Sequence, residues 1–87
     1  MTATFTFRDG ALGPARLVVR PRGSALRLVL VAADGHPHGV VTDVGGRRVR
    51  LVVAPGATRQ ATVAAPRPGR YRVVPDGAAP PVLLVVR

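Results

Sequence analysis

Apolar and polar residues alternate with a period of two along most of the chain. Near the N-terminus, Ala3, Phe5 and Phe7 fall on one face and the threonines between them fall on the other. Alternation of this kind is typical of a β-strand with one buried face. The pattern recurs between turns that contain Gly and Pro, and it predicts strands at residues 2–8, 15–20, 25–32, 40–43, 47–53, 59–64, 70–74 and 82–86.

Short strands at regular spacing, with turn signals between them and no helical pattern, predict an all-β fold. We expect a Greek-key β-sandwich of about seven to eight strands. The chain has 87 residues, and a chain of this length buries too little surface for two cores. We therefore expect a single domain over residues 1–87, with Phe5 and Phe7 in the core and Tyr71 at a sandwich corner.

The chain is strongly basic, with a formal net charge of +9. All 13 basic residues are arginines and all 4 acidic residues are aspartates. Selection for an arginine-rich binding surface is not expected to remove glutamate as well, whereas a GC-rich coding bias enriches arginine and depletes lysine. Coding bias is therefore the leading explanation of the charge, and an anionic partner is the competing one. Seven arginines fall on outward positions of the predicted strands, which indicates a solvated shell spread over several strands. These arginines are Arg16, Arg20, Arg27, Arg48, Arg50, Arg70 and Arg72.

The side chains that common enzyme mechanisms need are absent or poorly placed. The chain has no cysteine, which excludes disulfides, thiolate zinc sites and cysteine nucleophiles. Ser24 is the only serine, and it lies in a predicted turn outside a nucleophile-elbow motif. The four aspartates, which lie in or beside predicted turns, are expected to cap the backbone. They are Asp9, Asp34, Asp43 and Asp76. We therefore do not expect an enzyme.

Targeting and membrane signals are missing from the sequence. The N-terminal residues contain neither the basic nor the apolar segment of a signal peptide. Apolar runs such as Val82–Val86 are far too short to span a bilayer. We expect a cytoplasmic location for the chain as written, and export only if a leader is missing from it.

Strands and turns follow one another in an order that matches a known family. A predicted strand over 26–32 leads to a loop that carries His38, and a later strand ends at the Pro55-Gly56 turn. A Pro-Gly-x-Tyr-x-apolar segment, with its tyrosine at Tyr71, precedes a last apolar strand. In this order the chain resembles the cupredoxin family over nearly its whole length, which implies a cupredoxin-like sandwich.

The cupredoxin resemblance also implies where a blue-copper site would lie. Such a site takes two His, one Cys and usually a weak axial Met. His38 matches the first histidine, whereas Pro75 stands at the cysteine position and no His or Met follows it. The resemblance therefore implies a domain without most of the copper ligands. Electron transfer, the usual activity of the family, is not expected.

The segment His36-Pro37-His38 is the one candidate metal site in the sequence. Residues i and i+2 of an extended chain point to the same side, so both imidazoles can converge on one ion. Imidazole suits Cu(II), Ni(II) and Zn(II), and Asp34 can add a carboxylate. The other interpretation is a pair of exposed loop histidines. We expect no cofactor apart from copper at this pair.

These features leave three functional interpretations. The first is a copper-free, cupredoxin-like structural or interaction module that pairs an edge strand with an unidentified protein partner or with itself. Its outward valines suggest an interface, and they are Val18, Val29, Val31 and Val52. The second is Cu(II) or Ni(II) binding by His36 and His38. The third is a basic nucleic-acid or anionic-surface binder. Nucleic acid is disfavoured, because Tyr71 is the only aromatic available for stacking and is predicted to face inward.

Overall fold

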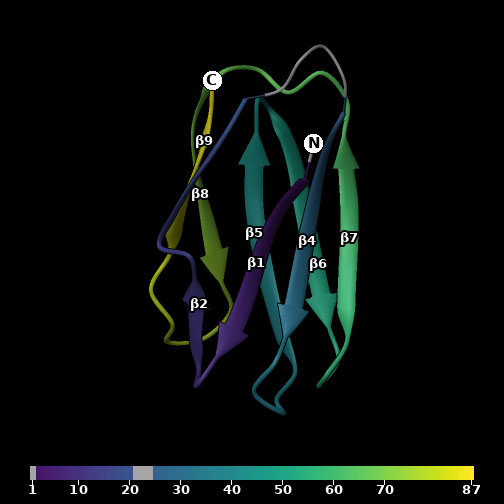
Figure 1. Ribbon diagram of the computed structural model, residues 1–87, viewed down its shortest axis with the longest axis vertical. Coiled ribbons are helices and arrows are strands. Elements are labelled where there is room, and N and C mark those ends of the chain that lie inside the picture. Colours follow the sequence, from purple (N-terminus) through teal and green to yellow (C-terminus); the bar gives the residue numbers. More distant parts are fainter. Residues whose placement is uncertain (1, 21–24) are drawn as a thin grey trace.

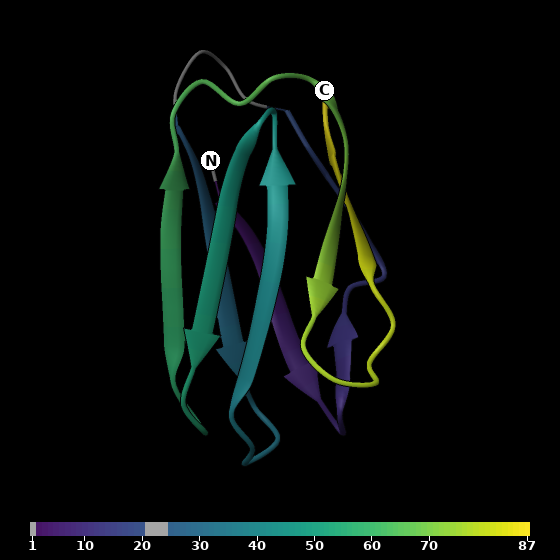
Figure 2. The same cartoon turned by 180° about the vertical axis from the view of Figure 1, so that it is seen from behind.

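The chain forms nine β-strands in two sheets, as seen in a computed structural model that describes residues 2–20 and 25–87. The strands are β1 (Thr2–Arg8), β2 (Ala11–Gly13), β3 (Arg16–Val19), β4 (Leu26–Ala32), β5 (His38–Val44), β6 (Arg47–Val53), β7 (Thr58–Val63), β8 (Gly69–Pro75) and β9 (Val82–Val86). One sheet has the order β2-β1-β4-β7 and faces the viewer in Figure 1. The other has the order β3-β9-β8-β5-β6 and faces the viewer in Figure 2.

The predicted β-sandwich is confirmed by this arrangement. Strands β5 and β6 form a hairpin, β7 joins the opposite sheet, and β8 returns to the free side of β5. A fourth strand that returns beside the first is the Greek-key connection. All eight predicted strands are present, and β2 is an additional one. Strand β5 begins at His38 rather than at residue 40. The turn predicted around Ser24 falls within residues 21–24, outside the described residues.

The core lies between the two sheets and is built from the inward positions of the alternating pattern. Phe7, Leu30 and Leu84 are among its largest fully buried side chains. Phe5 is also buried, as predicted. Tyr71 packs against the core, and its hydroxyl donates a hydrogen bond of 2.6 Å to the carbonyl oxygen of Arg67. The predicted corner role of Tyr71 therefore has a direct structural basis.

The β1–β2 turn positions part of the site described below. Arg8 pairs with Ala11, which leaves Asp9 and Gly10 as a two-residue hairpin loop. Both loop residues have positive φ angles, of 51° and 76°. Two consecutive positive φ angles define a type I′ turn, whose twist matches that of the flanking strands. The Asp-Gly pair supplies the residue types that this conformation favours, and the sequence prediction of a turn here is confirmed.

No helix suited to crossing a membrane occurs in residues 2–20 and 25–87.

Candidate functional site

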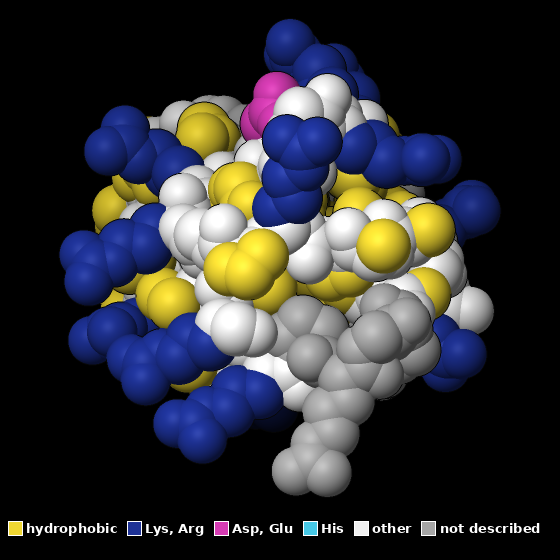
Figure 3. Space-filling model, turned by 90° about the horizontal axis from the view of Figure 1, so that it is seen from above, with side chains coloured by type: hydrophobic (Ala, Val, Ile, Leu, Met, Phe, Trp, Pro, Cys, Tyr) yellow, Lys and Arg dark blue, Asp and Glu magenta, His cyan; other side chains and the backbone are white. Residues whose placement is uncertain are grey.

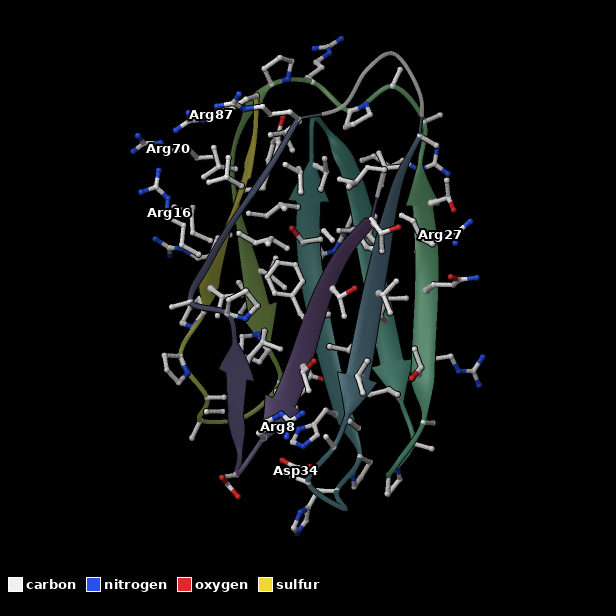
Figure 4. All side chains as sticks on the ribbon, viewed as in Figure 1. Arg8, Arg16, Arg27, Asp34, Arg70 and Arg87 are labelled. Carbon is white, nitrogen blue, oxygen red and sulfur yellow. The ribbon has the colours of Figure 1, made fainter. Side chains whose placement is uncertain are left out.

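Asp34 joins two loops at one end of the sandwich. It lies between β4 and β5, and its side chain is only 7% exposed. One carboxylate oxygen accepts a hydrogen bond of 3.0 Å from the backbone N–H of Gly10, in the β1–β2 turn. The other accepts a longer bond of 3.3 Å from the backbone N–H of His36. Figure 4 shows Asp34 beside the end of β1, near Arg8. The prediction that Asp34 caps the backbone is confirmed.

His38 is the first residue of β5, and its side chain packs inward with 15% exposure. Its Nε2 atom lies 2.7 Å and 2.9 Å from the two carboxylate oxygens of Asp34. The imidazole stacks on the buried ring of Phe7, with centroids 3.8 Å apart and an interplanar angle of 2°. Because an ionised carboxylate only accepts hydrogen bonds, Nε2 carries the proton and Nδ1 is the nitrogen left for another partner.

His36 is more exposed and is held by a different atom of the same aspartate. Its Nδ1 atom lies 3.0 Å from the backbone carbonyl oxygen of Asp34. A carbonyl oxygen only accepts, so Nδ1 donates and Nε2 is left with a lone pair. His36, His38 and Asp34 line an open pocket of about 400 Å³, together with Asp9 and Gly10. The structure therefore brings the predicted metal residues to one pocket.

Two opposing effects act on the pKa of the Asp34 carboxyl. Desolvation by burial raises the pKa, because it disfavours the charged form. The hydrogen bond from His38 lowers it, as do the backbone N–H groups of Gly10 and His36 and, when the imidazole is protonated, the charge of His38. The lowering effects prevail, and the pKa of Asp34 falls below its ordinary value. Asp34 is therefore ionised at neutral pH.

The donor set does not suit a blue-copper centre. The chain has no cysteine, and Pro75 at the expected cysteine position is a buried residue of β8 paired with Val40. Among the described residues, no group of three or more His, Cys, Asp or Glu side chains could hold a metal ion. His36 and His38 remain a predicted two-ligand site, in which Asp34 would orient the His38 ring rather than bind the metal directly.

A second candidate site is the outer face of the five-stranded sheet. The outward positions of β3, β6 and β8 are occupied by arginines and by every second valine, as their exposure shows. Arg47, at the start of β6, falls on the other phase of the alternation. We call this the arginine–valine face. It consists of Arg16, Arg48, Arg50, Arg70, Arg72, Val18, Val52 and Val74. The three valines are the large apolar side chains that the described residues expose, with values of 40%, 59% and 44%.

The arginine–valine face refines two sequence predictions. All seven arginines predicted to point outward are exposed, but five of them share this sheet instead of forming an even shell. Arg16, Arg70 and Arg87 lie along the margin near β8 and β9, and Arg27 lies at the opposite margin (Figure 4). The prediction of exposed valines holds for Val18 and Val52. Val29 and Val31 are half-buried on the other sheet.

The view from above shows how charge and apolar surface are mixed at one end of the molecule. Basic side chains protrude around much of the rim, apolar surface lies between them, and very little acidic surface is in view (Figure 3). This view agrees with the composition, in which arginines far outnumber aspartates.

Val74 was not predicted as part of an interface, although its outward position follows from the same alternation that placed Tyr71 and Val73 inward.

Comparison with known proteins gives a clear result for the fold. Neither a protein-family model nor a curated protein matches the sequence. Among solved structures, auracyanin B is similar with a TM-score of 0.77 and 18% identity, over 99% of this chain and 88% of that chain. The chain has the cupredoxin fold. Reduced auracyanin from Roseiflexus castenholzii has a TM-score of 0.72 and 17% identity, over 99% and 96% of the two chains.

A third cupredoxin-fold structure is the purple cupredoxin from Nitrosopumilus maritimus. Its TM-score is 0.64 at 16% identity, over 98% of this chain and 99% of that chain. These matches to cupredoxins extend over nearly all of this chain, and they agree with the order of strands and turns found in the sequence. It establishes this chain as a cupredoxin-like β-sandwich without a cysteine.

Proposed function

We propose that this domain is an interaction module without electron-transfer chemistry, which binds an acidic protein partner through the arginine–valine face. The observation that carries the proposal is the presence of five exposed arginines and three exposed valines on one face of one sheet. Arginine is enriched in protein interfaces and at their energetic hot spots. Burial of the exposed valines between the arginines would add a hydrophobic contribution to the binding free energy.

The sheet register sets the spacing of the basic groups. Arg16 and Arg72 both pair with Leu83 of β9, one from each side. Their backbones are therefore two strand spacings apart, about 10 Å. In the next row, Val18 and Arg70 flank Val85 in the same way. Each of these rows thus combines charged and apolar side chains on neighbouring strands, which suits carboxylates on a partner with apolar contacts beside them.

Few arginines of this face have an ion-pair partner in the part of the chain that the structure describes. Among the described residues, Arg50 is the one arginine that forms an ion pair, with Asp76 at 3.8 Å. Both side chains are more than half exposed, and such surface pairs contribute little to stability. Asp43 lies directly opposite Arg48 in the sheet register, and no ion pair joins these two side chains. The guanidinium groups that form no ion pair can bind carboxylates of a partner through two parallel hydrogen bonds.

The aromatic residues favour a protein partner over a nucleic acid. Proteins that bind single strands combine a basic groove with exposed aromatic rings on which bases stack. Here Phe5 and Phe7 are buried, and Tyr71 packs against the core with its hydroxyl bonded to Arg67. The described part of the arginine–valine face contains no aromatic side chain. Its chemistry fits carboxylates and apolar side chains better than bases.

The proposal is tested with poly-L-glutamate as the acidic probe and calorimetry as the readout. The variant carries Arg48→Ala, Arg50→Ala and Arg72→Ala. We expect it to bind about tenfold more weakly, which corresponds to about 1.4 kcal/mol. The matched control removes the same charge elsewhere, through three substitutions at exposed arginines outside the face, and should lose less than about threefold. These substitutions are Arg8→Ala, Arg27→Ala and Arg67→Ala.

Two results would contradict the proposal. Equal losses in both triple variants would show that net charge, and not this face, determines binding. Tighter binding to a single-stranded oligothymidylate than to poly-L-glutamate, at equal chain charge and salt, would favour a nucleic-acid partner. Binding to the acidic probe should also weaken as salt rises, because salt screens exposed charges.

A further inference from the structure

The two sheets present four edge strands, and three of them are poorly suited to further pairing. Strand β2 has three residues and is followed by Pro14. Strand β3 has four residues and begins at Arg16. Strand β6 carries Arg47, Arg48 and Arg50. Short length, proline and charged side chains are the features with which proteins block edge-to-edge association.

Strand β7 is the exception among the described strands. Its six residues pair with β4 in an unbroken antiparallel register. It contains one charged residue, Arg59, and neither proline nor glycine. The side chains on its outward face are Thr58, Gln60 and Thr62, all uncharged and exposed. A regular, exposed strand of this kind is a template for another strand.

The hydrogen bonds around β4 show which backbone groups of β7 face away from β4. The N–H of Ala32 donates to Ala57 and its carbonyl accepts from Gly56, whereas the N–H of Ala33 donates to Phe7 of β1. The even-numbered residues of β4 therefore direct their backbone hydrogen bonds towards β7. In the strand register these residues lie opposite Arg59, Ala61 and Val63, which are thus the β7 residues bonded to β4. The N–H and carbonyl groups of Thr58, Gln60 and Thr62 point to the free edge.

We propose that two copies of this chain pair through β7, joining their four-stranded sheets into one continuous sheet. The residues with free backbone groups read Thr-x-Gln-x-Thr, which is the same in both directions. Antiparallel pairing about Gln60 places Gln60 opposite Gln60 of the second copy and Thr58 opposite Thr62. Each of these three pairs exchanges two backbone hydrogen bonds. Thr–Thr pairs across strands add hydrogen bonds on the exposed face.

This self-complementarity favours a second copy over a foreign strand. On the inner face, the same register places Arg59 opposite Ala61, a small residue over which its stem can lie. The two Arg59 backbones are then about 8 Å apart, close to the Debye length at physiological salt. Each copy also carries a net charge of +9. Association is therefore weak at low salt and strengthens as salt rises, the opposite of binding to an acidic partner.

The first experiment is size-exclusion chromatography with light scattering on the full chain, at concentrations up to about 1 mM. The measured mass should rise towards that of a dimer, and more so at about 0.5 M salt than at about 0.05 M. Gln60→Arg places two arginines opposite each other and should keep the chain monomeric. Thr4→Arg adds the same charge on β1, on the same outer face, and should leave most of the association intact.

A second experiment uses the absence of native cysteine. Directly opposite residues of a hydrogen-bonded pair have Cα atoms about 5.5 Å apart, within disulfide range. Gln60→Cys should therefore form a cross-linked dimer under mild oxidation. Thr4→Cys lies two strands from the edge, so its counterpart in the dimer is about 24 Å away and should not cross-link. The side chains of Thr4 and Gln60 are both exposed, which makes Thr4 a matched control.

Three results would overturn the β7 dimer. These are a monomeric mass at every concentration and salt, equal association of the Gln60→Arg and Thr4→Arg variants, and equal cross-linking of the two cysteine variants. None of them bears on the acidic partner, whose binding face lies on the other sheet.

Discussion

Thr42 is the one polar side chain buried in the core among residues 2–20 and 25–87. It lies on the inner face of β5, 4% exposed, and its hydroxyl has no hydrogen-bond partner among the described residues. Its direct neighbours in the sheet are Val49 of β6 and Val73 of β8, both buried. Thr42→Val replaces this hydroxyl with a methyl group of similar shape in an apolar environment. We therefore expect the substitution to stabilise the domain.

The expected size of the effect follows from the cost of burying an unpaired hydroxyl. Mutational data place this cost at about 1–3 kcal/mol. Taking the lower end, Thr42→Val should raise the free energy of unfolding by about 1 kcal/mol. For a domain of this length, that corresponds to a Tm increase of about 4–8 °C. The effect is large enough to resolve in either thermal or urea unfolding.

The assay compares Thr42→Val with Thr4→Val, an exposed site on β1. The exposed substitution should change stability by less than about 0.5 kcal/mol. A Thr42→Val variant that is no more stable than the parent would contradict this expectation and show that the hydroxyl makes a hydrogen bond in solution. Unchanged m-values in urea would confirm that only the stability of the folded state had changed.

Three further predictions concern the Asp34–His38 pocket and the Tyr71 corner. Because the pKa of Asp34 is lower in the folded state, its ionised carboxylate stabilises the fold at neutral pH. This contribution is lost as the pH falls through the lowered pKa, below about pH 4. Asp34→Asn should therefore be less stable than the parent at pH 7 in urea unfolding, and it should lose less stability on acidification. Tyr71→Phe removes the bond to the Arg67 carbonyl and should cost about 1 kcal/mol in the same assay. If His36 and His38 form a Cu(II) or Ni(II) site, calorimetry should show binding tighter than about micromolar that disappears when both are changed to Ala; weaker binding, or binding unaffected by those changes, rejects that alternative.

Much of the fold was predictable because strand alternation and turn residues are local signals. The inward positions of Phe5 and Phe7 and the turns at Asp9-Gly10 and Pro55-Gly56 follow from a few neighbouring residues each. Strand β2 was missed because its three residues are too few to show alternation. The start of β5 was also missed, because Gly39 interrupts the apolar pattern there although its neighbours pair regularly with β6.

The candidate sites were less predictable because they depend on contacts between distant segments. The spacing of His36 and His38 was visible, but the stacking of His38 on Phe7 requires β1 and β5 to meet across the sandwich. The bond from Gly10 to Asp34 spans two loops in the same way. Similarly, alternation shows that Arg48 and Arg72 point outward, but not that their strands share one sheet. That information lies in the strand order.

Amide chemical-shift mapping during titration with poly-L-glutamate shows directly which face binds the acidic probe. We expect the largest shifts in β3, β6 and β8, at the arginine–valine face, with the amides of β1 and β7 nearly unchanged. Equal shifts over both sheets, or shifts confined to the Asp34–His38 pocket, would contradict it.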